Sequence, residues 1–117
     1  MEKTFFVQEM HLAKQPFEQI KKGEKTVEIR LNDEKRKRLK VGDVLRFTLV
    51  DGNETVTTRI VALHTFATFL QLFSSPLFEK TGSGNMTAEQ ATESMYAYYS
   101  RPQEERFGVL AIELQLL

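Results

Sequence analysis

The sequence predicts an α+β fold, a small and partly closed mixed β-barrel of about five strands with short helices packed at its side. A strong turn signal, Asp-Gly-Asn at 51–53, separates two strand-like segments at 44–50 and 55–63, which should therefore form an antiparallel hairpin. The expected order of strand, helix, strand, hairpin, helices and strand lacks the regular alternation of a parallel βαβ sheet. The length of 117 residues and the hydrophobic content of 41% suit one domain spanning 1–117.

The chain begins with a predicted strand at 4–12. A short helix follows near Pro16, since proline is tolerated in a first helical turn. Phe17 and Ile20 lie three residues apart and so fall on one face of that helix. Gly23 ends the helix after two lysines and lets the chain turn sharply into the next segment.

Polar and apolar residues alternate from 26 to 31, as in a strand with one buried face and one face in water. The apolar face consists of Val27, Ile29 and Leu31. The polar face consists of Thr26, Glu28 and Arg30. Lys25 precedes the strand, so two cations and one carboxylate are expected to meet at its entrance.

Residues 32–40 are the most densely charged part of the chain. The pattern predicts a solvated turn or a short helix. The functional alternative is a local phosphate-binding patch, which Asp33 and Glu34 partly neutralise. A tight Val-Gly-Asp turn at 41–43 then leads into the hairpin.

Apolar residues recur at helical spacing between His64 and Phe73, which predicts a helix with Thr65 or Thr68 as its cap. The stripe is expected to pack in the core rather than to stack on bases, and it consists of Phe66, Phe69, Leu70 and Phe73. The sequence Thr-Gly-Ser-Gly at 81–84 predicts a flexible loop.

Two more helical segments and a strand are expected in the last third of the chain. Thr87 is predicted to cap a helix, with Glu89 and Gln90 in the first turn as in a capping box. A further helical turn is expected at 101–106 and a final strand at 109–117, where apolar residues alternate.

The composition excludes several classes of protein. The absence of cysteine excludes disulfides and thiolate metal sites and fits a cytoplasmic protein. No apolar run approaches the roughly 20 residues of a membrane span, so no membrane contact is expected. A net charge of zero, from +3 in 1–60 and −3 in 61–117, argues against broad binding to duplex nucleic acid. His11 and His64 lack carboxylates at metal-site spacing, and neither a metal nor a cofactor is expected.

The pattern Gly-x-Lys-x-x-Glu-x-Arg after a short helix resembles the signature of the ASCH domain family, the activating signal cointegrator homology domains. It is formed here by Gly23, Lys25, Glu28 and Arg30. The turn at 41–43 and the start of the last strand at 107–109 resemble further elements of the family, so the resemblance covers nearly the whole chain. It implies a PUA-like β-barrel with a cleft where the lysine, glutamate and arginine gather, and a role in binding RNA or modified nucleosides.

The candidate ligand-binding residues are therefore Lys25, Thr26, Glu28 and Arg30. Lys25 can place a point charge on a phosphate or polarise a carbonyl, and Arg30 offers a planar fork. Glu28 can hold Arg30 in place or accept from the exocyclic amine of a base. A purely structural ion pair between Glu28 and Arg30 is the alternative. A tyrosine ring can also stack on a base, the candidates being Tyr96, Tyr98 and Tyr99.

Two other functions compete with the binding of RNA or a nucleotide-like small molecule. Similarity to the ASCH amidohydrolases implies removal of the acetyl group from acetylated cytidine or a related amide, with Lys25 and Glu28 as catalytic residues. In that branch a threonine nucleophile falls at the position of Glu28 and a glutamate at that of Gly84, so weak or absent activity is expected. The third alternative is an interaction module that receives a protein in the cleft.

Overall fold

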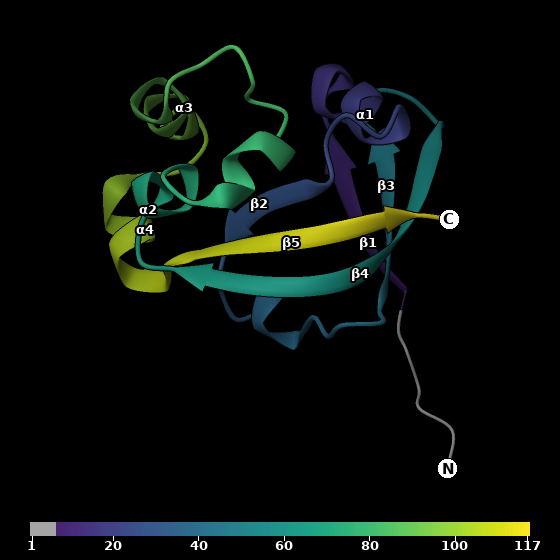
Figure 1. Cartoon of the computed structure of the whole chain (residues 1–117). Coiled ribbons are helices and arrows are strands. Elements are labelled where there is room, and N and C mark those ends of the chain that lie inside the picture. Colours follow the sequence, from purple (N-terminus) through teal and green to yellow (C-terminus); the bar gives the residue numbers. More distant parts are fainter. Residues whose placement is uncertain (1–6) are drawn as a thin grey trace.

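The computed structural model of the chain describes residues 7–117, which form one curled, five-stranded sheet with short helices at its side (Figure 1). The strands are β1 (Val7–Leu12), β2 (Val27–Leu31), β3 (Val44–Leu49), β4 (Thr55–Phe66) and β5 (Val109–Leu116). Their order in the sheet is β1-β3-β4-β5-β2, with β1 parallel to β3 and every other pair antiparallel. The predicted α+β barrel of about five strands is therefore confirmed, as a half-barrel whose edge strands are β1 and β2.

The helical segments connect these strands and cover parts of the sheet. They are α1 (Lys14–Lys21), η1 (Arg36–Arg38), α2 (Phe69–Phe73), η2 (Pro76–Lys80), α3 (Ala88–Met95) and α4 (Arg101–Phe107). The predicted capping box at the start of α3 is confirmed, because Thr87 accepts from the Gln90 N–H while the Gln90 side chain accepts from the Thr87 N–H.

The predicted hairpin is confirmed, with β3 and β4 paired antiparallel in a register that joins Val44 to Arg59 and Thr48 to Thr55. A register shift between Ile60 and Ala62 interrupts the pairing of β4 with β5. Such an irregularity bends a strand and increases its twist, which helps the sheet to curl.

The helix predicted from His64 to Phe73 is wrong over its first residues. β4 continues to Phe66 because it pairs with the whole first half of β5, up to the Phe66–Val109 pair. These sheet hydrogen bonds override the helical spacing of the aromatic residues. The helix α2 begins only after Thr68, whose side chain accepts from the Gln71 N–H as its cap.

Of the first predicted strand, 4–12, the part from Val7 onward is confirmed as β1, and residues 4–6 lie outside the described residues. In the predicted aromatic stripe, Phe69 and Phe73 are buried as expected, whereas Leu70 is exposed.

The strand β5 is buried on both faces along most of its length and separates two hydrophobic clusters. Leu110 and Ile112 point into the first cluster, which fills the half-barrel beneath α1 and contains Phe17 and Phe47. Val109 and Ala111 point into the second, which packs β2 against α2 and α3. This double burial makes β5 the central element of the fold.

The first prediction concerns β5. The Ile112→Ala variant should lower the free energy of unfolding by about 2–5 kcal/mol, because it removes most of a fully buried side chain and leaves a cavity in its place. Urea denaturation measures the change. Leu116→Ala is the control, because that side chain lies on the same strand but is exposed, and its effect should be small. Equal losses for the two variants would contradict the core assigned to β5.

Candidate ligand site between the edge strands

The edge strands β1 and β2 approach each other at the open side of the half-barrel, where a side chain bridges them. The Nη2 atom of Arg30 on β2 donates to the backbone oxygen of His11 on β1 over 3.3 Å. A cavity of about 420 Å³ lies along this seam. It is lined by residues from β1, α1, β2, the 81–83 loop and the end of α3, namely His11, Leu12, Ala13, Pro16, Lys25, Glu28, Ile29, Arg30, Thr81, Ser83, Met95, Tyr98 and Tyr99. We call it the seam cavity.

Glu28 and Arg30 point toward the inside of the half-barrel. In the sheet they lie beside Ile112 and Leu110 of β5, which belong to the cluster beneath α1. Glu28 is only 5% exposed, so the expectation that the polar face of this strand lies in water is wrong. Alternation correctly separates the two faces of β2, but both faces are covered, one by helices and the other by the curl of the sheet.

Lys25 is held at the base of the cavity by two oxygen atoms. The chain leaves α1 through Gly23, whose positive φ of 79° is a conformation that glycine adopts without strain. The Nζ atom of Lys25 then donates to the backbone oxygen of Thr81 over 2.9 Å and lies 3.4 Å from Oε1 of Glu28. With 7% of its surface exposed, Lys25 is a buried cation that ties the 81–83 loop to β2.

The carboxylate of Glu28 is engaged through both of its oxygen atoms. Oε1 accepts from the backbone N–H of Ile29 over 2.9 Å and faces Lys25, while Oε2 accepts from Nη2 of Arg30 over 3.2 Å. Burial by itself raises the pKa of this carboxyl group, but Lys25, Arg30 and the Ile29 N–H more than offset it, so the Glu28 pKa lies below its ordinary value. Glu28 is therefore ionised and serves to hold the two cations.

Arg30 keeps part of its guanidinium group available. Both of its hydrogen bonds, to Glu28 and to His11, leave from Nη2. Among residues 7–117, Nε and Nη1 have no hydrogen-bond partner, and the side chain is 16% exposed. A planar donor edge thus remains for an acceptor in the seam cavity.

The tyrosines differ in role. Tyr98 is 77% exposed at the edge of the cavity. Tyr99 also lines it, and its ring stacks on Phe69 with centroids 5.8 Å apart, so this ring packs against the core. Tyr96 donates through its hydroxyl to Oε1 of Glu104 and lines a different cavity. Only Tyr98 presents most of its ring to solvent.

Thr26 is not brought into the seam cavity, although alternation places it on the same face as Glu28. Thr26 instead lines a smaller cavity together with Ile20 and Thr58, and its backbone pairs with Lys80 and Leu114. Its role in ligand binding stays a prediction. Conversely, sequence reasoning did not assign His11 to the site, because only the strand order brings it there. The expectation that part of the loop at 81–87 lies at the rim agrees with the positions of Thr81 and Ser83.

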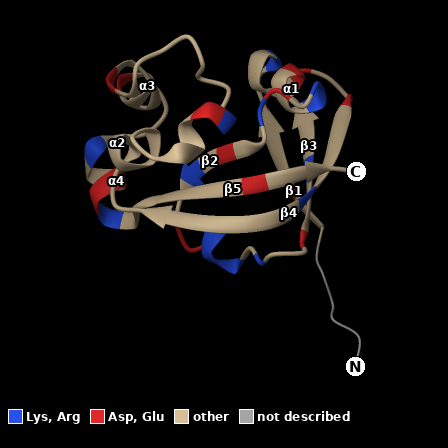
Figure 2. Cartoon of the chain, viewed as in Figure 1, with Lys and Arg blue, Asp and Glu red and all other residues tan. Residues whose placement is uncertain are grey.

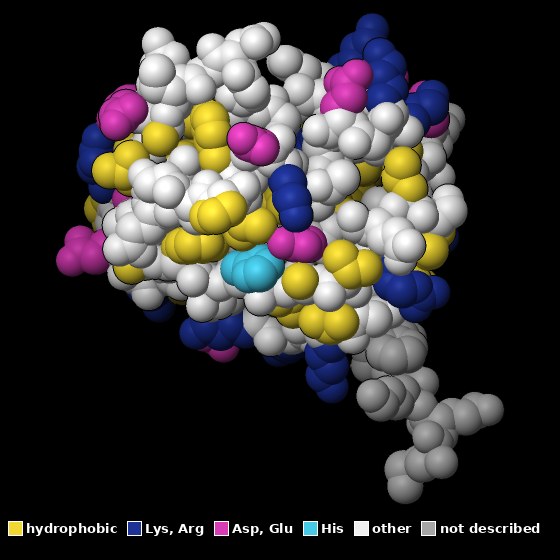
Figure 3. Space-filling model, viewed as in Figure 1, with side chains coloured by type: hydrophobic (Ala, Val, Ile, Leu, Met, Phe, Trp, Pro, Cys, Tyr) yellow, Lys and Arg dark blue, Asp and Glu magenta, His cyan; other side chains and the backbone are white. Residues whose placement is uncertain are grey.

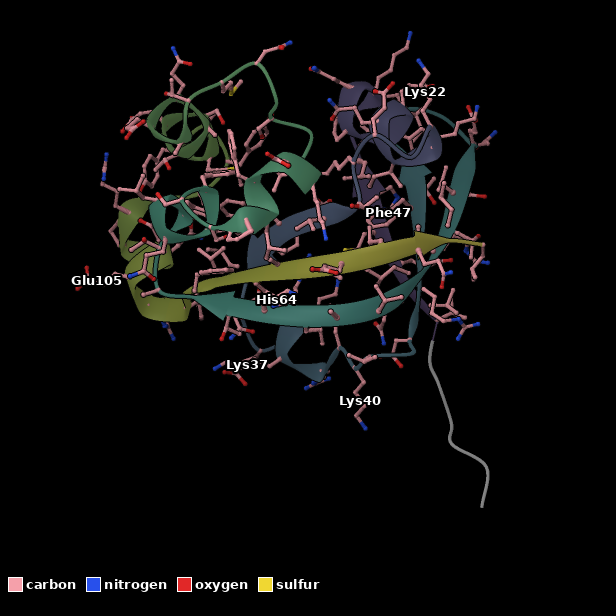
Figure 4. The ribbon with its side chains drawn as sticks, viewed as in Figure 1. Lys22, Lys37, Lys40, Phe47, His64 and Glu105 are labelled. Atoms are coloured by element: carbon pink, nitrogen blue, oxygen red, sulfur yellow. The ribbon has the colours of Figure 1, made fainter. Side chains whose placement is uncertain are left out.

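A contact between a histidine and a carboxylate lies on the outer face of β4 and β5. His64 on β4 lies 3.0 Å from Glu113 on β5, and both are partly exposed. Figure 3 shows a histidine beside an acidic side chain among exposed hydrophobic groups on this face, and Figure 4 labels His64 there. Within residues 7–117 no three metal-ligating side chains come together, and no helix is long and apolar enough to cross a membrane.

The second prediction follows from the lowered pKa of Glu28. Its ion pairs should stabilise the fold fully above the ordinary pKa of 4.5, and this stabilisation should be lost as the pH falls through the lower pKa of the folded state. The Glu28→Gln variant should be less stable at pH 7 by about 3–5 kcal/mol, because it leaves buried cations uncompensated. Denaturation at several pH values should show the gap between wild type and variant closing in acid.

Glu93→Gln is the matched control, since Glu93 forms an exposed pair with Arg101 and should change stability little at any pH. A gap for Glu28→Gln that stays constant down to pH values well below 4.5 would contradict the assignment of an ionised, buried Glu28.

Several solved protein structures are similar to this chain. The chain is similar to Protein PF0455 from Pyrococcus furiosus, with 31% identity and a TM-score of 0.77 over 95% of this chain and 97% of that one. It is similar to hypothetical protein PH0355, with 27% identity and a TM-score of 0.85 over 97% of this chain and 100% of that one. An ASCH domain from Lactobacillus crispatus JV V101 shares the fold at 16% identity, with a TM-score of 0.67 over 97% of this chain and 79% of that one.

No curated protein matches the chain. The model of the ASCH domain family matches residues 10–117, which is nearly the whole sequence and includes the complete seam cavity. This chain therefore belongs to the ASCH domain family, as a small PUA-like domain.

Proposed function

We propose that this protein binds a nucleotide-like ligand, either a modified nucleoside or one nucleotide of an RNA chain, in the seam cavity. The observation that carries the proposal is the arrangement of Lys25 and Arg30 around the single carboxylate of Glu28 at the base of a cavity edged by Tyr98.

The charge balance of the site favours an oxygen-rich ligand. Two cations share one carboxylate, so the group carries a net charge of +1 in a largely desolvated place. Electrostatic attraction is stronger there than at an open surface. Lys25 has three donors, of which two face Thr81 and Glu28, and Arg30 retains its Nε and Nη1 edge. Phosphate and carbonyl oxygens are the partners these donors bind most strongly.

The size and the walls of the cavity also suit a nucleoside. A volume of about 420 Å³ lies within the roughly 300–1,000 Å³ of small-molecule sites. The exposed ring of Tyr98 offers a surface for stacking, which tolerates any base because every base has a π face. Since both oxygens of Glu28 are engaged, we assign it the role of orienting the cations rather than of contacting a base.

The third prediction is the test of binding. Thermal shift measurements with nucleosides, modified nucleosides, nucleotides and short RNAs should give at least one ligand that stabilises the fold by about 2.7 kcal/mol at 100 times its dissociation constant. The Tyr98→Ala variant should weaken that ligand by about 1–3 kcal/mol, the usual value of one stacked base.

Leu70→Ala is the control for Tyr98→Ala, because Leu70 is an exposed apolar residue that lines a different cavity. It should leave affinity unchanged. If no compound of these classes shifts the unfolding temperature, the proposed function is wrong. If a ligand binds equally well to the Tyr98→Ala variant, the base is not stacked on this ring.

The fourth prediction is that purified protein releases little cytidine from acetylcytidine. Glu28 is a weak general base, because its pKa is lowered and its oxygens are occupied, and Thr26 lines another cavity. Chromatography of the reaction mixture measures the cytidine formed. Turnover at the rate of a dedicated amidohydrolase, abolished by Lys25→Ala, would place catalysis at this site and contradict a binding function alone.

A further inference from the structure

The turn between β2 and β3 carries the densest positive charge of the chain. Residues 33–40 contain five Lys or Arg and two Asp or Glu. Four of the cations are exposed, while Leu39 among them is 7% exposed and anchors the turn to the core. Figure 2 shows this charge as a blue group on the turn that bears η1, and in Figure 4 the side chains of Lys37 and Lys40 extend away from the ribbon. We call residues 33–40 the basic turn.

The acidic residues of the basic turn neutralise only part of it. Asp33 accepts from the backbone N–H of Arg36 over 3.0 Å and pairs with the Arg36 guanidinium at 3.4 Å, so this arginine is used to shape the turn. Glu34 lies 3.6 Å from Lys37, and both side chains are exposed, so the pair is weak. Lys35 and Arg38 form no ion pair with any residue in 7–117. Their charges are therefore available to a partner.

The basic turn begins close to the seam cavity along the chain. β2 carries Arg30 and leads directly into the turn. Arg30 lines the cavity and stands three residues before Asp33, a separation of at most about 11 Å along an extended chain. An oligonucleotide that leaves the cavity past Arg30 would therefore reach the basic turn.

We propose that the basic turn binds the phosphodiester backbone of a single-stranded oligonucleotide, one nucleotide of which occupies the seam cavity. The inference rests on the proposed function and makes its ligand a polymer rather than a free nucleoside. Proteins that bind single strands combine an aromatic stacking surface with a positively charged path for the backbone, and here Tyr98 and the basic turn supply the two parts. Because the whole chain has no net charge, this attraction is local.

The experiment compares the nucleoside monophosphates with a random-sequence RNA hexamer, using fluorescence anisotropy between about 50 mM and about 200 mM salt. The hexamer should bind at least about tenfold more tightly than the best monophosphate, because the nucleotide in the cavity and the phosphates on the basic turn belong to one linked chain. The Lys35→Ala/Arg38→Ala variant should lower the salt slope for the hexamer by about 1.4, since each lost phosphate contact accounts for about 0.7. Its affinity for the monophosphates should stay nearly unchanged.

The matched control is Lys21→Ala/Lys22→Ala, which also removes two exposed cations, both at the end of α1. Lys22 lies at the opposite end of the molecule from Lys37 and Lys40 (Figure 4). This variant should keep the salt slope of the wild type. The four substitutions affect exposed side chains, so the thermal midpoints of both variants should match that of the wild type.

Several outcomes would overturn the inference. If monophosphates bind but the hexamer binds no more tightly, the cavity takes free nucleotides and the inference fails while the proposed function stands. If both double variants lower the slope equally, the attraction is not located at the basic turn. If polyglutamate of the same charge competes as well as the hexamer, the turn is a general anion surface. If neither probe binds, the proposed function fails as well.

Discussion

The buried carboxylate of Glu28 is the interaction on which the site depends. It fixes Lys25 and Arg30, and it accepts from the Ile29 N–H on an edge strand. Through these two cations it also connects β2 to the 81–83 loop and to the end of β1, because Lys25 binds the oxygen of Thr81 and Arg30 that of His11. Apolar residues of similar volume often replace a buried ion pair without loss of stability, so the presence of this largely buried charged group agrees with the ligand-binding role proposed above.

Local sequence signals predicted the parts of the fold that depend on neighbouring residues. The hairpin of β3 and β4 follows from the turn at 51–53, and the start of α3 follows from the pair Thr87 and Gln90. The helix at 64–73 was partly wrong, because the aromatic spacing gives no information on the strand that pairs with β4. Tertiary pairing decides between helix and strand for such an ambiguous segment.

The candidate site could be predicted only in part for the same reason. The spacing of Lys25, Glu28 and Arg30 correctly indicated that these side chains meet at the entrance of one strand. Their burial could not be read from alternation, which separates two faces but does not say what covers each. The contribution of His11 requires that two edge strands of a curled sheet meet, a property of the whole topology rather than of any segment.

The central position of β5 has a consequence for the order in which the chain can fold. β2 pairs only with β5 in the sheet, and the register joins Val27 to Glu113, far apart in the sequence. The hairpin of β3 and β4 can form soon after synthesis, whereas β2 has no strand to pair with until the last strand is made. Long-range pairing of this kind slows folding and prolongs the exposure of apolar strands to aggregation. In a newly made chain, the segment that bears the candidate site is therefore among the last to be protected.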